Sequence, residues 1–204
     1  MTSTEFGERT LRLSSRIWQW LYAMFLSPHM SPVLFFLDFA VYPPIILACL
    51  YFGVTQQTVA SSVLLVVLGY AVWTLAEYLV HRFILHHVPL FAKMHHEHHD
   101  EALELIGTPT LMSLFFLYVI VYLPLSFAVG TSTALCSMAG FLTGYISYVW
   151  VHYAVHHKGS GGFKFMRKLK RQHAVHHYGA NDYNFGVTTD IWDKIFQTKR
   201  DKLT

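Results

Sequence analysis

Histidine is the residue type whose number and spacing stand out in this sequence. There are fourteen, and thirteen of them lie between His81 and His177. Two segments, HHEHH at 95–99 and HAVHH at 173–177, share the pattern H-x-x-H-H. Because positions i, i+3 and i+4 lie on one face of a helix, each segment predicts three imidazoles presented together. Imidazole is the commonest protein ligand of metal ions, so both segments indicate metal binding.

Two further pairs extend the pattern. His152 and His156 are four positions apart and share a helical face, whereas His81 and His86 are five apart and rotated from each other, which suits ligands of two different ions. The expected metal ligands are therefore ten: His81, His86, His95, His98, His99, His152, His156, His173, His176 and His177. Ten imidazoles fit two ions with about five ligands each. His87, His96 and His157 lie roughly 100° off these faces, so we expect them to support the ligands from behind or to face solvent.

The ligand type leaves the metal open, because imidazole suits zinc, copper, iron and nickel. A structural zinc site needs only four ligands, far fewer than this set. A pair of irons that activates O2 accounts for the larger number. We therefore expect two iron ions as cofactors and O2 as co-substrate, with zinc able to replace iron in purified protein.

The elements that must position these histidines are predicted by hydropathy. The chain of 204 residues is 53% hydrophobic and only 13% charged, whereas soluble domains carry about a quarter charged residues. Four apolar runs have the length of membrane-spanning helices: about 33–52, 59–80, 110–129 and 131–151. The short joints 53–58 and Gly130 make two helical hairpins. The proline pair Pro43-Pro44 is expected to kink or interrupt the first helix.

These runs predict an all-α, integral membrane four-helix bundle with a histidine-rich helical cap. We expect residues 1–32 to be a cytosolic or interfacial segment and 33–204 one membrane-embedded domain, with the cap formed by 81–108 and 152–204. Cys49 and Cys136 fall within apolar runs and indicate neither a disulfide nor a thiolate site.

The basic residues predict the topology. Of fifteen Lys and Arg, three precede residue 33, two lie between 81 and 108, and ten follow 157. With four crossings these segments share one side, which the positive-inside rule makes cytoplasmic. All the histidine groups then lie on that face, so residues far apart in sequence can share one site. No secretory signal is visible, and the bacterial inner membrane or the endoplasmic reticulum is the expected location.

The order H-x4-H, H-x-x-H-H, H-x3-H, H-x-x-H-H resembles the fatty acid hydroxylase superfamily of membrane di-iron enzymes, which includes fatty acid 2-hydroxylases and sterol desaturases. The segment NFGVTTDIWDKIFQT (184–198) is similar to the C-terminal signature of that family, and the resemblance covers about residues 70–198. It implies the same ten histidines as ligands. It also implies O2-dependent hydroxylation of a lipid alkyl carbon, with a fatty acyl chain as first choice of substrate.

The resemblance has one departure. His86 and His95 are nine positions apart, closer than in eukaryotic fatty acid 2-hydroxylases and more similar to sterol-desaturase-type or bacterial relatives, although LIGTPT (105–110) is similar to the hydroxylases. A sterol or isoprenoid desaturase or hydroxylase is therefore the alternative.

No haem domain fits before Val33, so an external electron donor, a haem or iron–sulfur protein with its reductase, is expected.

Several other residues carry expectations. Glu77, one turn before His81, is placed to hold the free ring N–H of a ligand, while Asp38 suits a helix N-terminus and Glu97 points to solvent. The basic run 164–173 suits membrane headgroups or an acidic electron-transfer protein, and nucleic acid is not an expected partner. Segment 190–196 has an apolar side typical of an interfacial helix or of core packing.

A metal transporter and a structural zinc protein are rival functions. A transporter predicts ionisable residues along a path through the bilayer. The last two apolar runs contain none, and the first two contain only Asp38 and Glu77 near their cytoplasmic ends.

Overall fold

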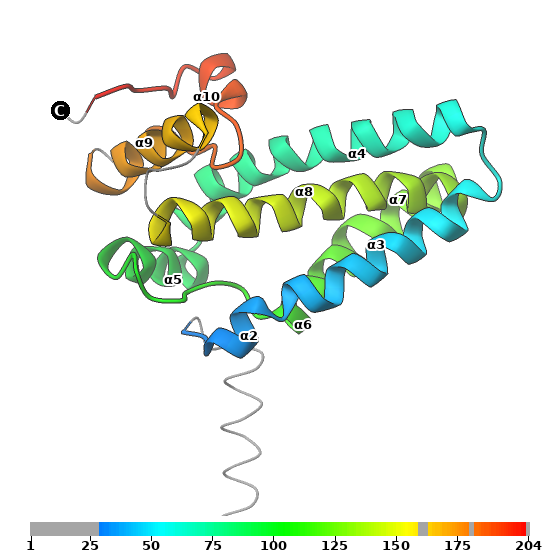
Figure 1. Cartoon of the computed structure of the whole chain (residues 1–204), viewed down its shortest axis with the longest axis horizontal. Helices are drawn as coiled ribbons and strands as arrows, with labels where there is room; N and C mark the ends of the chain where they lie inside the picture. The colour runs from blue at the N-terminus through cyan, green and yellow to red at the C-terminus, as the bar shows by residue number, and fades with distance from the viewer. Residues whose placement is uncertain (1–28, 159–162, 180–181, 203–204) are drawn as a thin grey trace, which may run out of the picture.

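The computed structural model describes residues 29–158, 163–179 and 182–202. Within these ranges the regular structure is helical, and the strand-like feature is one isolated bridge between His29 and Ile106. Four helical spans in this part of the chain are long and apolar enough to cross a membrane: Pro32–Val54, Val59–Leu85, Thr110–Val129 and Thr131–His157. The prediction of an all-helical, four-span membrane fold is confirmed (Figure 1).

The first span consists of α2 (Pro32–Phe36) and α3 (Asp38–Val54). The break between them falls at Leu37, and the chain stays helical through Pro43 and Pro44. The expected interruption at the proline pair is therefore absent, because membrane helices tolerate the lost backbone hydrogen bonds when neighbouring groups compensate.

The second span is α4 (Val59–Leu79) followed by a π-helical segment, η1 (Val80–Leu85). The third comprises α6 (Thr110–Phe116), the π-helical η2 (Leu117–Tyr122) and α7 (Leu123–Val129), and the fourth is the single helix α8 (Thr131–His157). Gly130 joins the last two with φ of +81°, a conformation that glycine adopts without strain. The second and fourth spans run past the apolar runs, so the pair His81 and His86 lies at the end of one span and the pair His152 and His156 at the end of the other.

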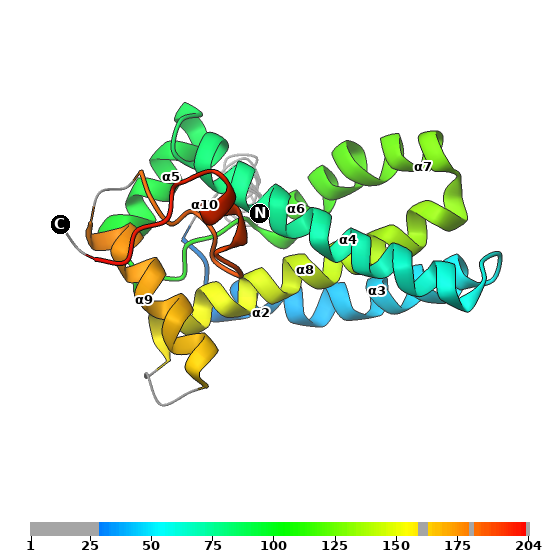
Figure 2. The ribbon, with the colours of Figure 1, turned by 90° about the horizontal axis from the view of Figure 1, so that it is seen from above.

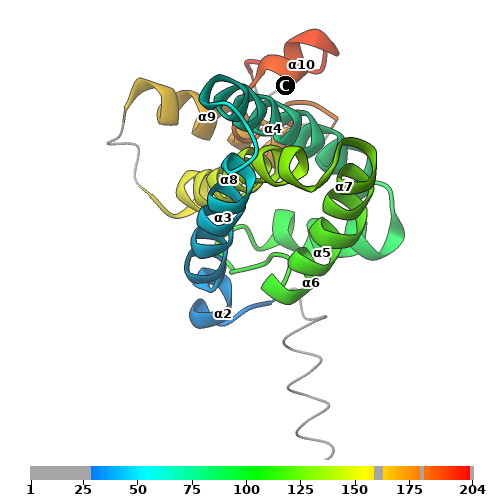
Figure 3. The same cartoon turned by 90° about the vertical axis from the view of Figure 1, so that its right-hand side faces the viewer.

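α8 is the central helix of the bundle. Figure 3, which looks along the spans, shows it between α3 and α4, with α6 and α7 to one side. Its Phe141, Leu142 and Tyr145 form a buried core with Tyr42 of α3. A methyl group on Gly140 would collide with the Val66 carbonyl of α4, so these two backbones are in direct contact. This close packing fixes the relative position of the helix ends that carry histidines.

The cap lies at one end of the bundle, where α4 and α8 finish (Figures 1 and 2). It contains α5 (Pro89–Asp100), α9 (Lys164–Tyr178) and the short α10 (Ile191–Ile195). Trp192 donates a hydrogen bond to Thr74 Oγ1 of α4 at 3.1 Å, while Ile191 and Ile195 remain exposed. α10 is thus attached to the side of a membrane span with apolar side chains free to contact lipid.

Candidate metal centre

The ten predicted histidines form two groups of five at the cap end of the bundle. The first group is His81, His86, His95, His99 and His176, and the second is His98, His152, His156, His173 and His177. Within each group the ligand atoms all lie within 4.8 Å of one another. Both groups have the same composition: a pair from the end of a membrane span, an i, i+4 pair from one cap helix, and a single histidine from the other.

His81 and His86 belong to one group, contrary to the expectation that they would serve different ions. The five-residue spacing would separate them on an α-helix, but η1 is a π-helix with i→i+5 hydrogen bonds. The wider turn brings both side chains to one side, and their ring centroids are 5.3 Å apart. Such single-turn π segments are frequent at functional sites.

The two H-x-x-H-H triplets are each divided between the groups. On α5, His95 and His99 belong to the first group and His98 to the second; on α9, His173 and His177 belong to the second and His176 to the first. Each triplet does lie on one helical face, but that face lies between the two groups. The exchange of one histidine from each cap helix links the two groups into a single arrangement.

The nitrogen spacing fits metal coordination. The Nε2 atoms of His81 and His95 are 3.0 Å apart, as are those of His98 and His152, and those of His156 and His173 are 2.8 Å apart. Two nitrogens bound at right angles to one ion, each at about 2.1 Å, are about 3.0 Å from each other. The rings are therefore spaced as ligands of a common ion in each group.

Backbone carbonyl groups orient two rings of the first group, that of His81 at the end of a span and that of His176 on α9. The Nδ1 of His81 donates to the Phe185 carbonyl at 2.5 Å, and the Nδ1 of His176 donates to the Tyr183 carbonyl at 2.8 Å. A carbonyl can only accept, so each Nδ1 carries the proton and each Nε2 presents a lone pair. Both tautomers are those that bind a metal through Nε2.

Glu77 does not contact a histidine, which corrects the expectation that it holds His81. Its buried carboxylate accepts hydrogen bonds from the Val187 and Thr188 N–H groups, at 2.6 and 2.9 Å, and from the Thr188 hydroxyl. Glu77 therefore holds the segment 183–188, whose carbonyls in turn orient the rings. The sequence alone could not show this link, because the two partners are 110 residues apart.

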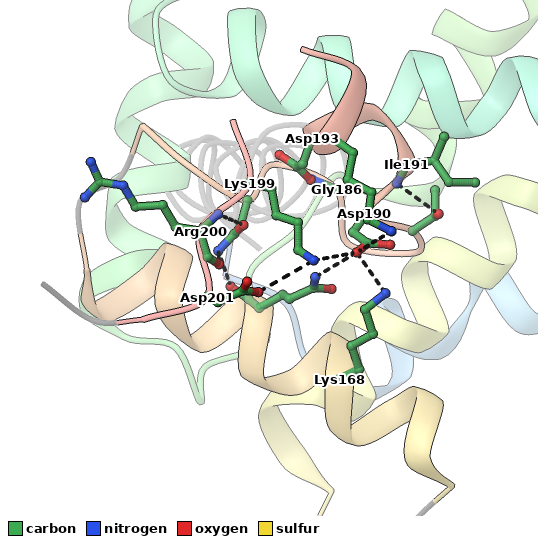
Figure 4. A network of polar contacts seen from close by, with 12 residues as sticks. Lys168, Gly186, Asp190, Ile191, Asp193, Lys199, Arg200 and Asp201 are labelled. Carbon is green, nitrogen blue, oxygen red and sulfur yellow. Dashed lines mark hydrogen bonds and ion pairs between the residues drawn. The ribbon is translucent and has the colours of Figure 1, made fainter. Parts of the chain in front are cut away.

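Asp193 also holds this segment, and Asp190 links α9 to the residues that follow it (Figure 4). Asp193 accepts from the Phe185 and Gly186 N–H groups, each at 2.9 Å. Three lysines surround Asp190 Oδ2: Lys168 of α9 at 2.8 Å, with Lys194 at 3.1 Å and Lys199 at 3.3 Å. These contacts tie α9, α10 and the C-terminal segment into one unit behind the histidines.

Burial keeps the cap histidines neutral. Burial, with repulsion from neighbouring imidazoles, lowers the pKa of His86 and of His99 to about 4 and that of His98 to about 3. The same causes lower the pKa of four further cap histidines: His95, His173, His176 and His177. Neutral imidazole is the form that binds metal, so at neutral pH these rings are ready to do so.

A pocket of about 100 Å³ lies between the ends of the spans and the cap, beside the histidines. His95 of the first group and His98 and His152 of the second line it. The remaining lining is mostly apolar, and comes from both the spans and the cap: Met30, Phe35, Leu85, Met94, Ile106 and Val149, with Gly107, Thr108, Asp38, Tyr145 and Tyr148. An apolar chain placed here would lie beside both groups.

The three histidines expected off the ligand faces stand outside the two groups, as does His29. His87 is exposed and its Nδ1 donates to the Arg82 carbonyl at 2.9 Å, His96 is exposed, and His157 stacks on Tyr153 at 4.5 Å. Glu97 lies 3.7 Å from His29 and away from the groups. Asp38 is in the first turn of α3, as expected for a helix N-terminus, but it is also buried and lines the pocket.

The fold and the two histidine groups define the class: an all-helical membrane protein with two sites of metal-binding geometry at one end of its bundle. The sequence profile of the fatty acid hydroxylase family matches residues 66–198. The chain belongs to this family, as the order of its histidine motifs predicted.

Individual relatives agree with this assignment. A dihydroceramide fatty acyl 2-hydroxylase of Arabidopsis thaliana is 34% identical over 146 residues, which are 66% of this chain and 60% of that protein. The fatty acid 2-hydroxylase of Homo sapiens is 35% identical over 152 residues, 66% of this chain and 39% of that one. A solved structure of Scs7p, in which only the hydroxylase domain is visible, has a TM-score of 0.71 and 29% identity, covering 81% of this chain and 66% of its own. The chain thus spans 60% and 39% of the length of the two curated relatives.

Proposed function

We propose that this protein is an O2-dependent lipid hydroxylase with two iron ions, each held by one group of five histidines. The observation that carries the proposal is the pocket, which is lined by histidines of both groups and by apolar side chains from the spans. The reaction would convert an alkyl C–H bond to C–OH, consuming O2, two electrons and two protons and releasing water. The irons would supply the redox chemistry, which no side chain in the pocket can perform.

The chain's own residues would bind, orient and shield. The ten histidines hold the ions, the segment 183–188 sets the ring orientation of His81 and His176, and the apolar lining excludes water from the reacting carbon. The relatives are named as 2-hydroxylases of fatty acids and of dihydroceramide acyl chains, which supports a fatty acyl chain hydroxylated next to its carbonyl group. Hydroxylation or desaturation of a sterol or isoprenoid is the alternative within the same chemistry.

The decisive experiment measures metal, O2 and product on one preparation. Protein prepared without oxygen should contain two irons per chain, consume O2 when a reductant is added, and hydroxylate an acyl lipid detected by mass spectrometry. The matched control is His152→Ala with His156→Ala, which removes one span pair; it should abolish product. Protein that holds zinc even after iron loading and consumes no O2 would instead support a structural zinc site, and metal flux across vesicles would support a transporter.

We also propose that the electrons come from a separate protein that docks on α9. This helix has two opposite faces: His173, His176 and His177 are buried towards the metal groups, while Lys164, Arg167 and Arg171 are exposed. Arg167, Arg171 and Arg200 also line a groove between α9 and the C-terminal segment. An acidic donor seated there would be separated from the metal ions by one helix.

Charge reversal at Lys164 separates this docking surface from the membrane-headgroup alternative. Lys164→Glu should weaken turnover supported by an acidic redox protein several-fold, and should leave turnover supported by a small chemical reductant unchanged. Equal loss in both assays, or a loss only of binding to anionic vesicles, would contradict docking. Lys93→Glu, an exposed charge on α5, is the matched control.

The location follows from the same charges. We propose an integral membrane protein with the histidine cap on the cytoplasmic face, in a bacterial inner membrane or the endoplasmic reticulum, because the basic residues flank the cap end. A single cysteine placed at exposed Lys202 should react with a membrane-impermeant reagent only from the cytoplasmic side.

A further inference from the structure

One carboxyl group in the pocket is not used by the proposed chemistry. Asp38 lies at the start of α3, outside the residues matched by the family, and it lines the same pocket as His95, His98 and His152. Its side chain is 4% exposed. A carboxyl group at membrane depth is costly unless its oxygens are hydrogen-bonded, so its partners need an account.

Among the described residues, only one of the two oxygens has a partner at hydrogen-bond distance and angle. Asp38 Oδ2 accepts from the Tyr145 hydroxyl at 2.7 Å. Oδ1 is buried and has no hydrogen bond to any residue that the structure describes, although the Thr110 side chain lies near the carboxyl group. No ion pair in the described part of the chain involves Asp38.

A structural role explains only part of this arrangement. The N-terminus of α3 favours a negative charge, and Asp38 gives the buried Tyr145 hydroxyl an acceptor. Both effects use the carboxyl group as a hydrogen-bond acceptor, and they involve Oδ2 and the helix end. They leave Oδ1 as an unused acceptor on a residue that lines the pocket shared with both histidine groups.

We propose that Asp38 Oδ1 accepts a hydrogen bond from the polar head of the lipid substrate and thereby sets which carbon lies at the histidines. The proposal rests on the proposed hydroxylase function. The fitting partner is an amide N–H or a hydroxyl group near the acyl carbonyl. An ionised fatty acid has no such donor. Asp38 is therefore assigned as a residue that determines both head-group specificity and the position of hydroxylation.

The test compares two substrates in the full chain reconstituted with iron. One is an acyl amide carrying N–H and O–H donors, and the other is the same lipid methylated at those groups. The wild-type protein should prefer the first by about tenfold or more in kcat/KM and hydroxylate a single carbon. In Asp38→Leu the preference should fall to about one, and neighbouring carbons should also be hydroxylated, since the acyl chain can slide.

Binding gives a second readout that needs no catalysis. The donor-bearing amide should raise the unfolding temperature of metal-free wild-type protein and should not raise that of Asp38→Leu. Ser132→Ala is the matched control, because it removes a hydrogen bond from α8 to the Gly53 carbonyl of α3 and neither residue lines the pocket. It should keep the substrate preference and the single product.

The outcomes separate the inference from the function on which it rests. A wild-type protein that hydroxylates neither lipid contradicts the proposed function. An active wild-type protein that treats both lipids alike contradicts the role of Asp38, as does an Asp38→Leu protein with unchanged preference and product. If Asp38→Leu does not fold, Asp38→Asn replaces it: its amide oxygen accepts from Tyr145, which leaves an NH2 donor in the place of Oδ1, so the preference should again fall to about one.

Discussion

At the scale of single residues, the site depends on how imidazole rings are oriented as much as on which histidines are present. His81 and His176 each present Nε2 because a backbone carbonyl holds Nδ1–H. Those carbonyls belong to a segment that Glu77 holds through three hydrogen bonds. Outer partners of this kind typically change metal affinity or activity by 10–100-fold when they are removed.

Glu77→Leu is therefore expected to reduce iron affinity about tenfold or more without removing a ligand. The substitution leaves the Val187 and Thr188 N–H groups buried without an acceptor, so the segment must move and His81 loses its orientation. Glu77→Gln, which retains one acceptor oxygen, should lose less. Titration of metal-free protein with Fe²⁺ measures both, and equal affinity in all three proteins would contradict the indirect role of Glu77.

The division of the triplets gives a second prediction at this scale. His176→Ala should lower iron content from two ions per chain towards one by weakening the first group, whereas His173→Ala should weaken the second. A double variant with His99→Ala and His176→Ala should still hold one ion, because both changes fall in the same group. His96→Ala, an exposed position, should retain two. Loss of both ions from the double variant would contradict the division.

At the scale of elements, the π segment η1 positions the first histidine pair. His81 and His86 meet only because Val80–Leu85 has a wider turn than an α-helix. Deleting the exposed Ile84 should convert this segment to an α-helix, leave the pair at i, i+4 spacing and shift everything that follows by one position. We expect loss of iron from the first group with helix content unchanged in circular dichroism.

The control for this deletion is Ile84→Ala, which changes the same side chain and keeps the register. It should bind two irons and remain active. A deletion variant with full iron content would show that the histidine pair does not need the π-helical turn.

The sequence predicted the elements better than their contacts. Hydropathy located the four spans, because membrane length acts locally along the chain, whereas the orientation read from the basic residues stays a prediction. Spacing also selected all ten clustered histidines and excluded His87, His96 and His157. The π-helical turn at His81, the exchange of His98 and His176, and the partner of Glu77 depend on how distant elements pack, which no local pattern encodes.

At the scale of the whole molecule, a rigid bundle supports a cap that is rich in buried polar groups. The direct contact of α4 and α8 at Gly140 holds the two span pairs in place, and α5 and α9 close over them. Buried histidines are costly in their charged form, so the cap is expected to couple metal binding, protonation and stability.

The metal-free protein should accordingly lose stability as the pH falls below about 6.5. Burial lowers the pKa of His86 and His99 to about 4 and that of His98 to about 3, whereas an unfolded histidine has a pKa of about 6.5. Between these values the unfolded chain binds more protons, so the free energy of unfolding decreases as the pH is lowered through the window from 6.5 to 4. Each such histidine contributes up to about 1.4 kcal/mol per pH unit to this decrease in the free energy of unfolding.

Unfolding measured in detergent at pH 7.5, 6.0 and 5.0 should show this decline. Bound iron should shift the onset of the decline to lower pH, because protons must then displace the metal. A metal-free protein equally stable at pH 7.5 and 5.0 would mean that the cap histidines are hydrated, and the neutral, closely packed cap would then be wrong.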